Sequence, residues 1–258
     1  MRHVLAISDE RHFLVRSVSV DYSSGGFEEG HSHNWPQLLY TQKGALRVHL
    51  KDEVYILPPR RALWLPKKTP HEFFMSSDVE LRTLYIRPDE SSQRFMLHAI
   101  NVPGLLHEAI IRVCEKQQLD DRIAADQNLY RVIIHEIESA EANEYNLVLP
   151  TDARARKLAV RLLSFRGNLK AALEGSGLNR RTAERIFSTQ TGMSPAQWLR
   201  VARLSQSIIH LANGSPIDEV AVEAGYKSRS AFSHAFKTKF GFSPGKTASK
   251  RSQQISVS

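Results

Sequence analysis

The stretch Gly225–Pro244, which reads GYKSRSAFSHAFKTKFGFSP, decides the fold of the second half of this 258-residue chain. Gly225 can adopt the left-handed turn that a side chain resists, and Ser228 is suited to cap a helix that follows it. Gly241 is placed to end that helix. The apolar residues between them share one helical face: Phe232, Ala235, Phe236 and Phe240. The stretch therefore predicts a turn, a short basic amphipathic helix and a stop.

The same pattern occurs earlier, in Gly177–Pro195, which reads GLNRRTAERIFSTQTGMSP. When the two stretches are aligned on Phe187 and Phe236, 49 residues apart, both continue as F-x-x-x-x-G-[MF]-S-P. A repeat at a fixed offset indicates that one structural unit is built twice. Two basic amphipathic helices that each follow a glycine turn predict two helix-turn-helix units, each with a recognition helix for a DNA major groove.

The charge of the chain is divided unevenly. The formal net charge is +8, but the residues from Thr151 onward carry 18 Lys and Arg against 6 Asp and Glu, a net charge of +12. The residues before Thr151 therefore have a net charge of −4. A basic second half indicates a nucleic-acid partner for that half and a different partner for the first. An anionic membrane surface is the competing partner for a basic domain, but we expect none, because the apolar helix faces are needed for cores and no apolar run reaches the length of a membrane-spanning helix.

The second copy of the repeat, from Ser215 to Pro244, resembles the signature of the AraC/XylS family of bacterial transcription regulators nearly throughout. The resemblance covers residues 151–258. It implies a DNA-binding domain in which a long helix, here ending near Ala212, links two helix-turn-helix units. It also implies a homodimer, contact with RNA polymerase, and activation of transcription at promoter DNA.

Matching the family motif residue by residue places the DNA-facing positions on the two recognition helices. On the first helix they are Arg180, Arg181, Thr182 and Arg185, and on the second they are Ser230 and His234, flanked by Ser228, Arg229 and Lys237. Arg181 and Arg185 are four residues apart and share a face. Each could bind guanine O6 and N7 or, equally, a phosphate. Because the second set is less charged, we expect the first helix to carry more of the base specificity.

Residues 1–90 have the pattern of a β domain. Short apolar runs are separated by Lys, Gly, Pro and Asp residues, and they fall at Phe13–Val20, Gln37–Gln42, Ala45–Leu50, Val54–Leu57, Ala62–Leu65 and Glu80–Ile86. Short strands at this spacing predict a sandwich or a barrel. Jelly-roll barrels of this kind include the cupins.

Four polar residues of this half, His31, His33, Gln37 and His71, resemble the two cupin motifs, in which His-x-His, a glutamate and a later histidine converge on a metal. Residues two apart face the same side of a strand, so His31 and His33 are expected to do so. Three imidazoles could bind Zn²⁺, Fe²⁺ or Ni²⁺. Gln37 stands where the glutamate is expected, and an amide is a poorer ligand. Three interpretations remain open: the lining of a small-molecule pocket, a metal site, and structural histidines.

From about Ser91 to Ala142 the apolar period becomes helical. One stripe contains Leu105, Leu106, Ala109, Ile110, Val113 and Cys114, and another contains Leu129, Tyr130, Ile133, Ile134 and Ile137. These helices either pack on the barrel of the same chain or pair with a second subunit. The domain limits that we predict are residues 1–90 for the cupin-like domain, 91–150 for the helices and a linker, and 151–258 for the DNA-binding domain.

The predicted fold class is α+β in two domains, a cupin-like β-barrel followed by helices and an all-α double helix-turn-helix domain. We expect a transcription activator controlled by a small molecule or metal in the barrel, and no enzyme activity. The alternative is a metal-dependent cupin enzyme, an oxygenase or isomerase, with accessory DNA binding. The single cysteine, Cys114, excludes an intrachain disulfide and suits the cytoplasm.

Overall fold

The computed structural model describes residues 12–75, 77–89, 92, 95–143, 146–164 and 169–247. Contacts divide the chain into two compact units. Unit 1 contains Met1–Lys51 and Leu57–Tyr145, and unit 2 contains Asp52–Ile56 and Asn146–Ser258. A short segment from the first half of the sequence thus belongs to the unit that the second half forms.

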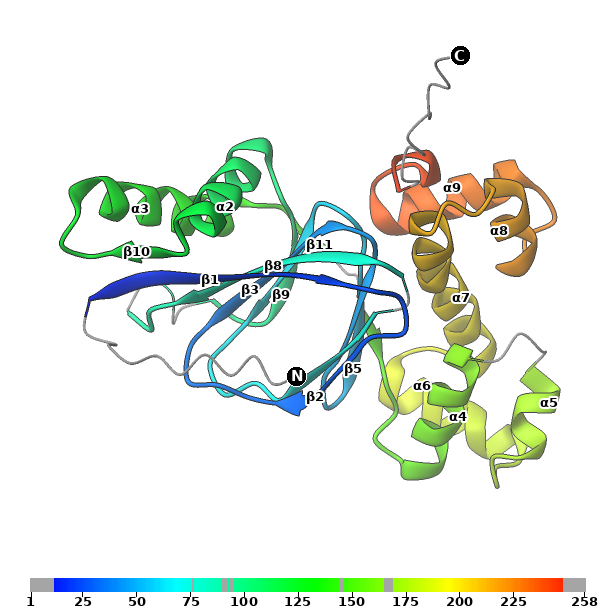
Figure 1. Ribbon diagram of the computed structural model, residues 1–258. Coiled ribbons are helices and arrows are strands. Elements are labelled where there is room, and N and C mark those ends of the chain that lie inside the picture. The colour runs from blue at the N-terminus through cyan, green and yellow to red at the C-terminus, as the bar shows by residue number, and fades with distance from the viewer. Residues whose placement is uncertain are drawn as a thin grey trace, which may run out of the picture. The chain divides into compact units, whose positions relative to one another are not determined.

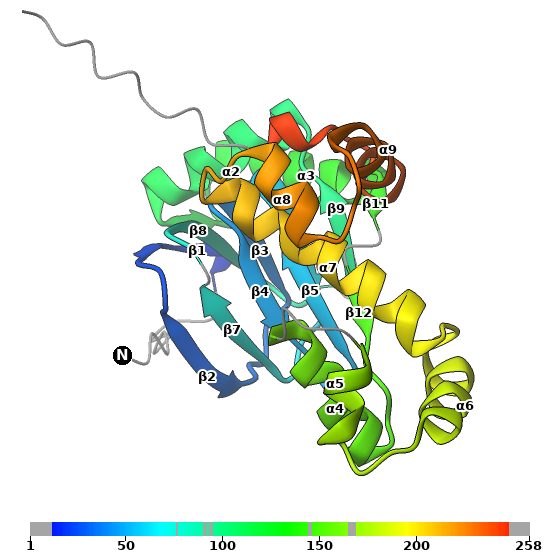
Figure 2. The ribbon, with the colours of Figure 1, turned by 90° about the vertical axis from the view of Figure 1, so that its right-hand side faces the viewer.

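Unit 1 contains a seven-stranded sheet in which every neighbouring pair is antiparallel, in the order β10-β1-β8-β3-β6-β9-β11. Its strands are β1 Phe13–Tyr22, β3 Gln37–Lys43, β6 Arg61–Leu65, β8 Val79–Ile86, β9 His98–Asn101, β10 Gln118–Asp120 and β11 Ala142–Asn143. In a second sheet of this unit, β2 (Phe27–His31), β7 (His71–Met75) and β4 (Leu46–His49) lie side by side in that order (Figure 2). The two sheets confirm the predicted β-rich first domain.

Several strands of this unit were not predicted. The sequences of β2 (FEEGH) and β7 (HEFFM) lack a clear alternation of apolar and polar residues. The prediction of helix alone for residues 91–142 was wrong at β9, β10 and β11. Each of these strands has two to four residues and is held by pairing with a neighbour that is distant in sequence. Tertiary pairing therefore overrode the local pattern.

Helices α2 (Gly104–Lys116) and α3 (Ala124–Ser139) lie over one face of the seven-stranded sheet (Figure 1). Their buried residues are Leu106, Ala109, Ile110 and Val113 on α2, and Asp126, Tyr130, Ile133, Ile134 and Ile137 on α3. The apolar ones form one core with Leu38, Tyr40 and Trp64 of the sheet. Packing within the chain thus accounts for most of both predicted stripes.

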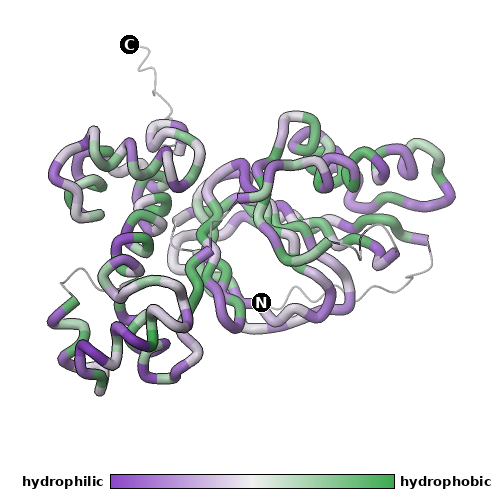
Figure 3. Tube along the Cα trace, turned by 180° about the vertical axis from the view of Figure 1, so that it is seen from behind, coloured by the Kyte–Doolittle hydropathy of each residue, from purple (hydrophilic) through white to green (hydrophobic). Residues whose placement is uncertain are grey.

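Unit 2 begins with an antiparallel pair, β5 (Glu53–Leu57) and β12 (Asn146–Val148). The rest of the unit is helical: α4 Ala153–Ser164, α5 Leu169–Glu174, α6 Arg180–Thr191, α7 Pro195–Ala212, α8 Ile217–Glu223, α9 Arg229–Phe240 and the 3₁₀ turn η1 Pro244–Lys246. The pairs α5–α6 and α8–α9 are the two predicted helix-turn-helix units, and α7 is the helix between them. Figure 3 shows hydrophobic and hydrophilic residues alternating along these helices, as amphipathic packing requires.

Local capping chemistry sets most helix ends of unit 2. Ser194 and Gln197 form a reciprocal capping box at the start of α7, and Gly192 and Gly241 end α6 and α9 at φ of 71° and 76°. Ser215, which like Ser194 precedes a proline, does not form such a cap. Its backbone N–H donates to the carbonyl of His210, which closes α7, and α8 begins without a side-chain cap.

Candidate DNA-binding and effector sites

Helix α6 is fixed by one cap and one buried face. The side chain of Asn179 accepts a hydrogen bond from the Thr182 backbone N–H at 2.8 Å, which satisfies a backbone donor of the first turn. The opposite face buries Ala183, Ile186 and Phe187. The helix therefore presents its basic side chains to solvent.

The arginines of α6 differ in their partners. Arg180 Nε lies 2.9 Å from Glu184 Oε1, an ion pair one turn apart. Arg181 and Arg185 are exposed, and within the described residues neither forms an ion pair. Thr182 is half-buried beside them. Two guanidinium groups of α6 are thus available to an external anion or base edge, and a third is partly neutralised.

Helix α9 has the same design with a different surface. The Ser228 hydroxyl accepts from the Ala231 N–H at 3.2 Å, and the buried face consists of Phe232, Phe236 and Phe240. The predicted DNA-facing residues are all exposed: Arg229, Ser230, His234 and Lys237. Arg229 lies 3.4 Å from Asp218 of α8. The predicted DNA-facing positions of α9 thus include two cations, Arg229 and Lys237, and those of α6 include three, Arg180, Arg181 and Arg185.

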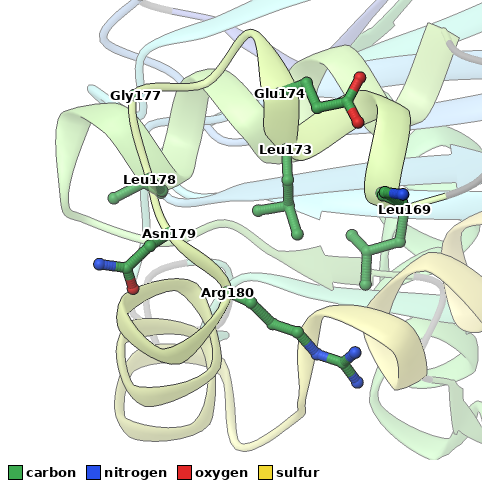
Figure 4. Close-up of a pocket in the computed structure, with 8 residues that line it drawn as sticks. Leu169, Leu173, Glu174, Gly177, Leu178, Asn179 and Arg180 are labelled. Atoms are coloured by element: carbon green, nitrogen blue, oxygen red, sulfur yellow. The ribbon is translucent and has the colours of Figure 1, made fainter.

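A groove beside α6 was not anticipated from the sequence. It has a volume of about 700 Å³ and is lined by Leu169, Lys170, Leu173, Glu174, Gly177, Leu178, Asn179 and Arg180. Figure 4 shows Leu169 and Leu173 projecting from α5 on the side of Arg180, while the Glu174 carboxylate points away. The groove arises where the short helix α5 packs against the start of α6, and no sequence pattern marks such a packing gap.

In unit 1 the four predicted effector residues lie together. The ring centroids of His31 and His71 are 4.4 Å apart, those of His33 and His71 are 5.3 Å apart, and those of His31 and His33 are 6.2 Å apart. The amide oxygen of Gln37 lies 2.9 Å from His33 Nε2. The four residues that the sequence grouped, from two separate stretches of the chain, therefore lie together in the structure.

The reason given for the pair His31 and His33 was wrong. Strand β2 ends at His31, so the two residues do not alternate along one strand. The carbonyl of His33 accepts from the Lys68 N–H at 2.7 Å, outside any strand pairing. The turn after β2, rather than period-two geometry, brings the two rings together.

Each imidazole of this cluster has one nitrogen engaged with the backbone. His31 Nδ1 lies 2.9 Å from the Glu29 carbonyl oxygen, His33 Nδ1 lies 2.6 Å from that of Trp35, and His71 Nδ1 lies 2.8 Å from that of Thr69. Burial lowers the pKa of His71 to about 4 and also lowers the pKa of His33. Both rings are therefore neutral at pH 7. A neutral ring has one N–H, so His71, which faces the Thr69 carbonyl through Nδ1, keeps Nε2 as a hydrogen-bond acceptor. His33 has an oxygen at each ring nitrogen and can donate to only one of them.

The second nitrogens differ among the rings. His71 is 2% exposed, and its Nε2 is buried without a hydrogen-bond partner in the described part of the chain. His33 Nε2 is engaged by Gln37, whose amide also donates to Thr83 Oγ1 at 2.8 Å. A buried polar atom without a partner is costly, so His71 Nε2 is the atom of this cluster that most needs a ligand.

Two residues next to the cluster escaped the sequence analysis. The Glu28 carboxylate accepts a hydrogen bond from the Tyr22 hydroxyl at 2.5 Å. The Tyr85 ring lies 5.1 Å from that of His33, and burial raises the pKa of Tyr85 to about 12, with Glu28 adding to the shift. Glu28 belongs to β2, which has no strand pattern, so the sequence carried no signal for it.

The cluster does not fit a three-histidine metal centre. Both ring nitrogens of His33 already face oxygen atoms, and the amide of Gln37 replaces the carboxylate ligand of the cupin motif. Within residues 12–247, as far as they are described, no group of three or more His, Cys, Asp or Glu side chains is arranged to hold a metal ion.

Two family models match the chain. An AraC-like ligand binding domain matches residues 15–133, and a helix-turn-helix domain matches residues 174–250. The chain belongs to the AraC family of transcriptional regulators. As an AraC-family regulator, it combines a ligand-binding domain of cupin-like fold with a DNA-binding domain that contains α6 and α9.

Two relatives that match most of the chain are named as transcriptional regulators. The HTH-type transcriptional regulator NimR of Escherichia coli is 22% identical over 84% of this chain and 80% of its own length. The probable transcriptional regulator LumQ of Photobacterium leiognathi is 22% identical over 83% of this chain and 89% of its own. Among solved structures, ToxT from Vibrio cholerae is 13% identical, covers 90% of this chain and 97% of its own, and has a TM-score of 0.36. None of the described helices of this AraC-family chain is both long enough and apolar enough to span a membrane.

Proposed function

We propose that this AraC-family regulator reads base sequence mainly through α6 and contacts the DNA backbone mainly through α9. The observation that carries the proposal is the difference in ion pairing. Arg181 and Arg185 are exposed and have no ion pair among the described residues, whereas Arg229 is paired with Asp218. An arginine whose fork is unoccupied can bind guanine in a bidentate manner.

The other predicted residues have supporting roles in this proposal. Arg180 shares its charge with Glu184 and is suited to a phosphate. On α9, Ser230, His234 and Lys237 are exposed and offer hydroxyl, imidazole and ammonium donors to the backbone. Thr182 adds a contact at the edge of the first helix. The Ser228 hydroxyl already accepts from Ala231, so Ser228 positions α9 and touches DNA only secondarily.

For the ligand-binding domain we propose an organic effector that donates hydrogen bonds. The unpartnered Nε2 of His71 is an acceptor, and the neighbouring Glu28 carboxylate forms no ion pair among the described residues. His31 and His33 flank His71, and Gln37 fixes His33. Such an environment favours a hydroxyl or N–H group of the ligand over a carboxylate. Sensing, rather than catalysis, is supported by the regulator names of NimR and LumQ.

Partners beyond DNA and the effector are also proposals. A homodimer through the outer face of α2 and α3 is supported by the exposed apolar residues Leu105, Ile123 and Val132. Contact with RNA polymerase, activation of a promoter and a cytoplasmic location are what the family resemblance implies. Gel filtration with light scattering on Val132→Asp tests the dimer, since a charge at this face should give a monomer.

Selection of bound duplexes from random-sequence DNA by the full chain tests the proposed reading of DNA. We expect a motif with two conserved boxes about one helical turn apart, roughly 34 Å, because α7 links two recognition helices. Repeating the selection with Arg181→Ala should relax one box and leave the other. If the variant weakens both boxes equally, Arg181 contacts phosphate rather than a base.

The metal content of the purified protein, measured beside that of a His31→Ala/His33→Ala double variant, tests the effector proposal. We expect no stoichiometric metal in either protein, because His33 has no ring nitrogen to offer. Stoichiometric Zn, Fe or Ni that disappears in the double variant would overturn the organic effector and restore the metal site.

A further inference from the structure

A segment of the first half of the chain belongs to the DNA-binding unit. The chain leaves unit 1 after Lys51, contributes Asp52–Ile56 to unit 2 and returns to unit 1 at Leu57. Within unit 2 this segment pairs with β12, so that Val54 faces Leu147 in the ladder. Both side chains are buried in the core of the first helix-turn-helix unit.

The ladder has several hydrogen bonds besides the strand pairing. The Leu149 N–H donates to the carbonyl of Asp52 at 2.8 Å. The side-chain amide of Asn146 donates to Glu53 at 3.0 Å, and Arg156 of α4 lies 3.6 Å from the Asp52 carboxylate. The two strands are therefore joined by backbone and side-chain hydrogen bonds over Glu53–Tyr55, and an ion pair connects the start of the segment with α4.

Two contacts connect α6 with β12 and with the residues that directly follow β12. The indole N–H of Trp198 donates to the carbonyl of Val148 in β12 at 2.8 Å, and the fully buried Trp198 ring packs edge-on against Phe187 of α6 at 5.9 Å. Farther along α6, the side-chain oxygen of Gln190 accepts from the N–H groups of Thr151 and Asp152 at 2.9 and 3.0 Å. Both contacts hold the helix that carries Arg181 and Arg185.

Helix α9 is supported differently. Its phenylalanines pack among themselves and against neighbouring rings: Phe232 against Tyr226 at 5.6 Å, and Phe236 against Phe240 and Phe242 at 4.7 and 5.4 Å. These contacts come from its own helix and from the turns on either side of it. Within the described residues α9 also packs on α8 and η1, its neighbours in sequence, whereas the core behind α6 includes Val54 of β5.

We propose that the β5–β12 ladder, with Trp198 and Gln190, is a positioning element for α6, and that unit 1 controls DNA binding through α6 rather than α9. The inference rests on the proposed reading of bases by α6. Because Lys51 and Leu57 of unit 1 flank the segment Asp52–Ile56 in the chain, a change in unit 1 acts on the ladder through covalent bonds. The ladder then acts on Phe187 and Gln190, which set how α6 presents its arginines.

The test uses full-length chains and the duplex selected from random DNA. We call the part of the selected motif that Arg181→Ala relaxes the α6 box. Binding is measured on two duplexes: the selected one, and one in which the α6 box is replaced by a scrambled sequence. The readout is the ratio of Kd on the scrambled duplex to Kd on the intact duplex, measured by fluorescence anisotropy. A variant that is only destabilised has a smaller folded fraction, which raises the apparent Kd for both duplexes by the same factor. The ratio of the two Kd values therefore stays constant.

Three variants loosen the element at separate points. Trp198→Phe keeps the packing on Phe187 and removes the bond to Val148, Gln190→Met removes the acceptor on an exposed side chain, and Val54→Ala acts from β5. We expect each to lower the ratio about two- to tenfold, the effect of one lost hydrogen bond or a loosened contact. Val220→Ala, a similarly buried truncation on α8 beside α9, is the matched control and should leave the ratio unchanged.

The outcomes separate the two proposals. Unchanged ratios in all three variants, or an equal fall in Val220→Ala, would overturn the positioning element. Gln190→Met keeps the test decisive if Trp198→Phe fails to fold, since Gln190 is on the surface. A selection that yields no α6 box at all would instead overturn the proposed reading of bases, before any of these variants is measured.

Discussion

The two recognition helices follow one sequence pattern but are held in place by different contacts. Both begin at a side-chain cap, Asn179 or Ser228, and both end at a glycine with positive φ. Phe187 and Phe236, which align in the repeat, are both fully buried. The backbone frame that presents a helix to DNA is thus the same in the two units.

The contacts behind the helices differ. Phe187 packs on Trp198, which is bonded to β12, whereas Phe236 packs on other phenylalanines of its own unit. The exposed faces differ as well, since α6 carries two arginines without ion pairs and α9 carries one arginine paired with Asp218. The repeat therefore preserves helix geometry, whereas the buried contacts behind the two helices and their exposed side chains differ.

The largest effect that would sharpen the comparison is expected from the buried rings. Phe187→Ala and Phe236→Ala should each lower the free energy of unfolding by about 3–5 kcal/mol, because each empties a fully buried site. Urea denaturation of the two variants measures this loss. If the supports are separate, Phe187→Ala should also abolish discrimination at the α6 box alone, and Phe236→Ala at the other box alone. A variant that abolishes discrimination at both boxes would show that the two helix-turn-helix units share one set of supporting contacts.

The next effect concerns the exposed arginines. Arg181→Ala and Arg185→Ala should each weaken binding to the selected duplex by about 1–3 kcal/mol, the range for a bidentate base contact. Arg229→Ala should cost less, since its guanidinium is already shared with Asp218. Anisotropy titrations on the selected duplex and on random DNA measure both values. If the losses of binding free energy are equal on the selected duplex and on random DNA, the arginines contact phosphates, and α6 and α9 do not differ in reading bases.

Much of this comparison could be predicted from the sequence. Glycines, caps and the phenylalanine repeat are local signals, and they predicted α6, α7 and α9 because helix ends are decided within a few residues. The exposed face of each recognition helix followed from period 3.6 alone. The family signature added which exposed positions face DNA.

The remainder depends on contacts between distant stretches. Nothing in the run Glu53–Leu57 shows that this strand pairs with the distant stretch Asn146–Val148. Similarly, the histidines could be grouped by motif, but the unpartnered Nε2 of His71 depends on the Thr69 carbonyl and on burial. Glu28 was missed because its strand is recognisable only through its pairing with β7. Such features come from tertiary packing, which a local pattern does not encode.

The caps offer a smaller and more symmetrical test. Asn179→Ala and Ser228→Ala should each lower the free energy of unfolding by about 1 kcal/mol, because each leaves one backbone N–H of the first turn without its acceptor. The bond of Asn179, at 2.8 Å, is shorter than that of Ser228, at 3.2 Å, so the larger loss is expected at α6. Asn179→Asp, which keeps the acceptor, is the control for thermal denaturation. A loss in the aspartate variant as large as in the alanine variant would mean that the cap is not the cause.

The smallest effect is expected where the charge of α6 is adjusted by its own glutamate. Glu184→Gln should change stability by less than about 0.5 kcal/mol, since an exposed ion pair contributes little. It frees Arg180 for a phosphate, so affinity at low salt should rise and the slope of log Kd against log salt should increase by about one. Glu174→Gln removes the same charge from the exposed side of α5 and is the matched control. If both variants steepen the salt dependence equally, net charge is responsible and the pairing of Arg180 with Glu184 does not set the α6 surface apart. If only Glu184→Gln does so, the ion pair itself limits how strongly α6 holds the DNA backbone.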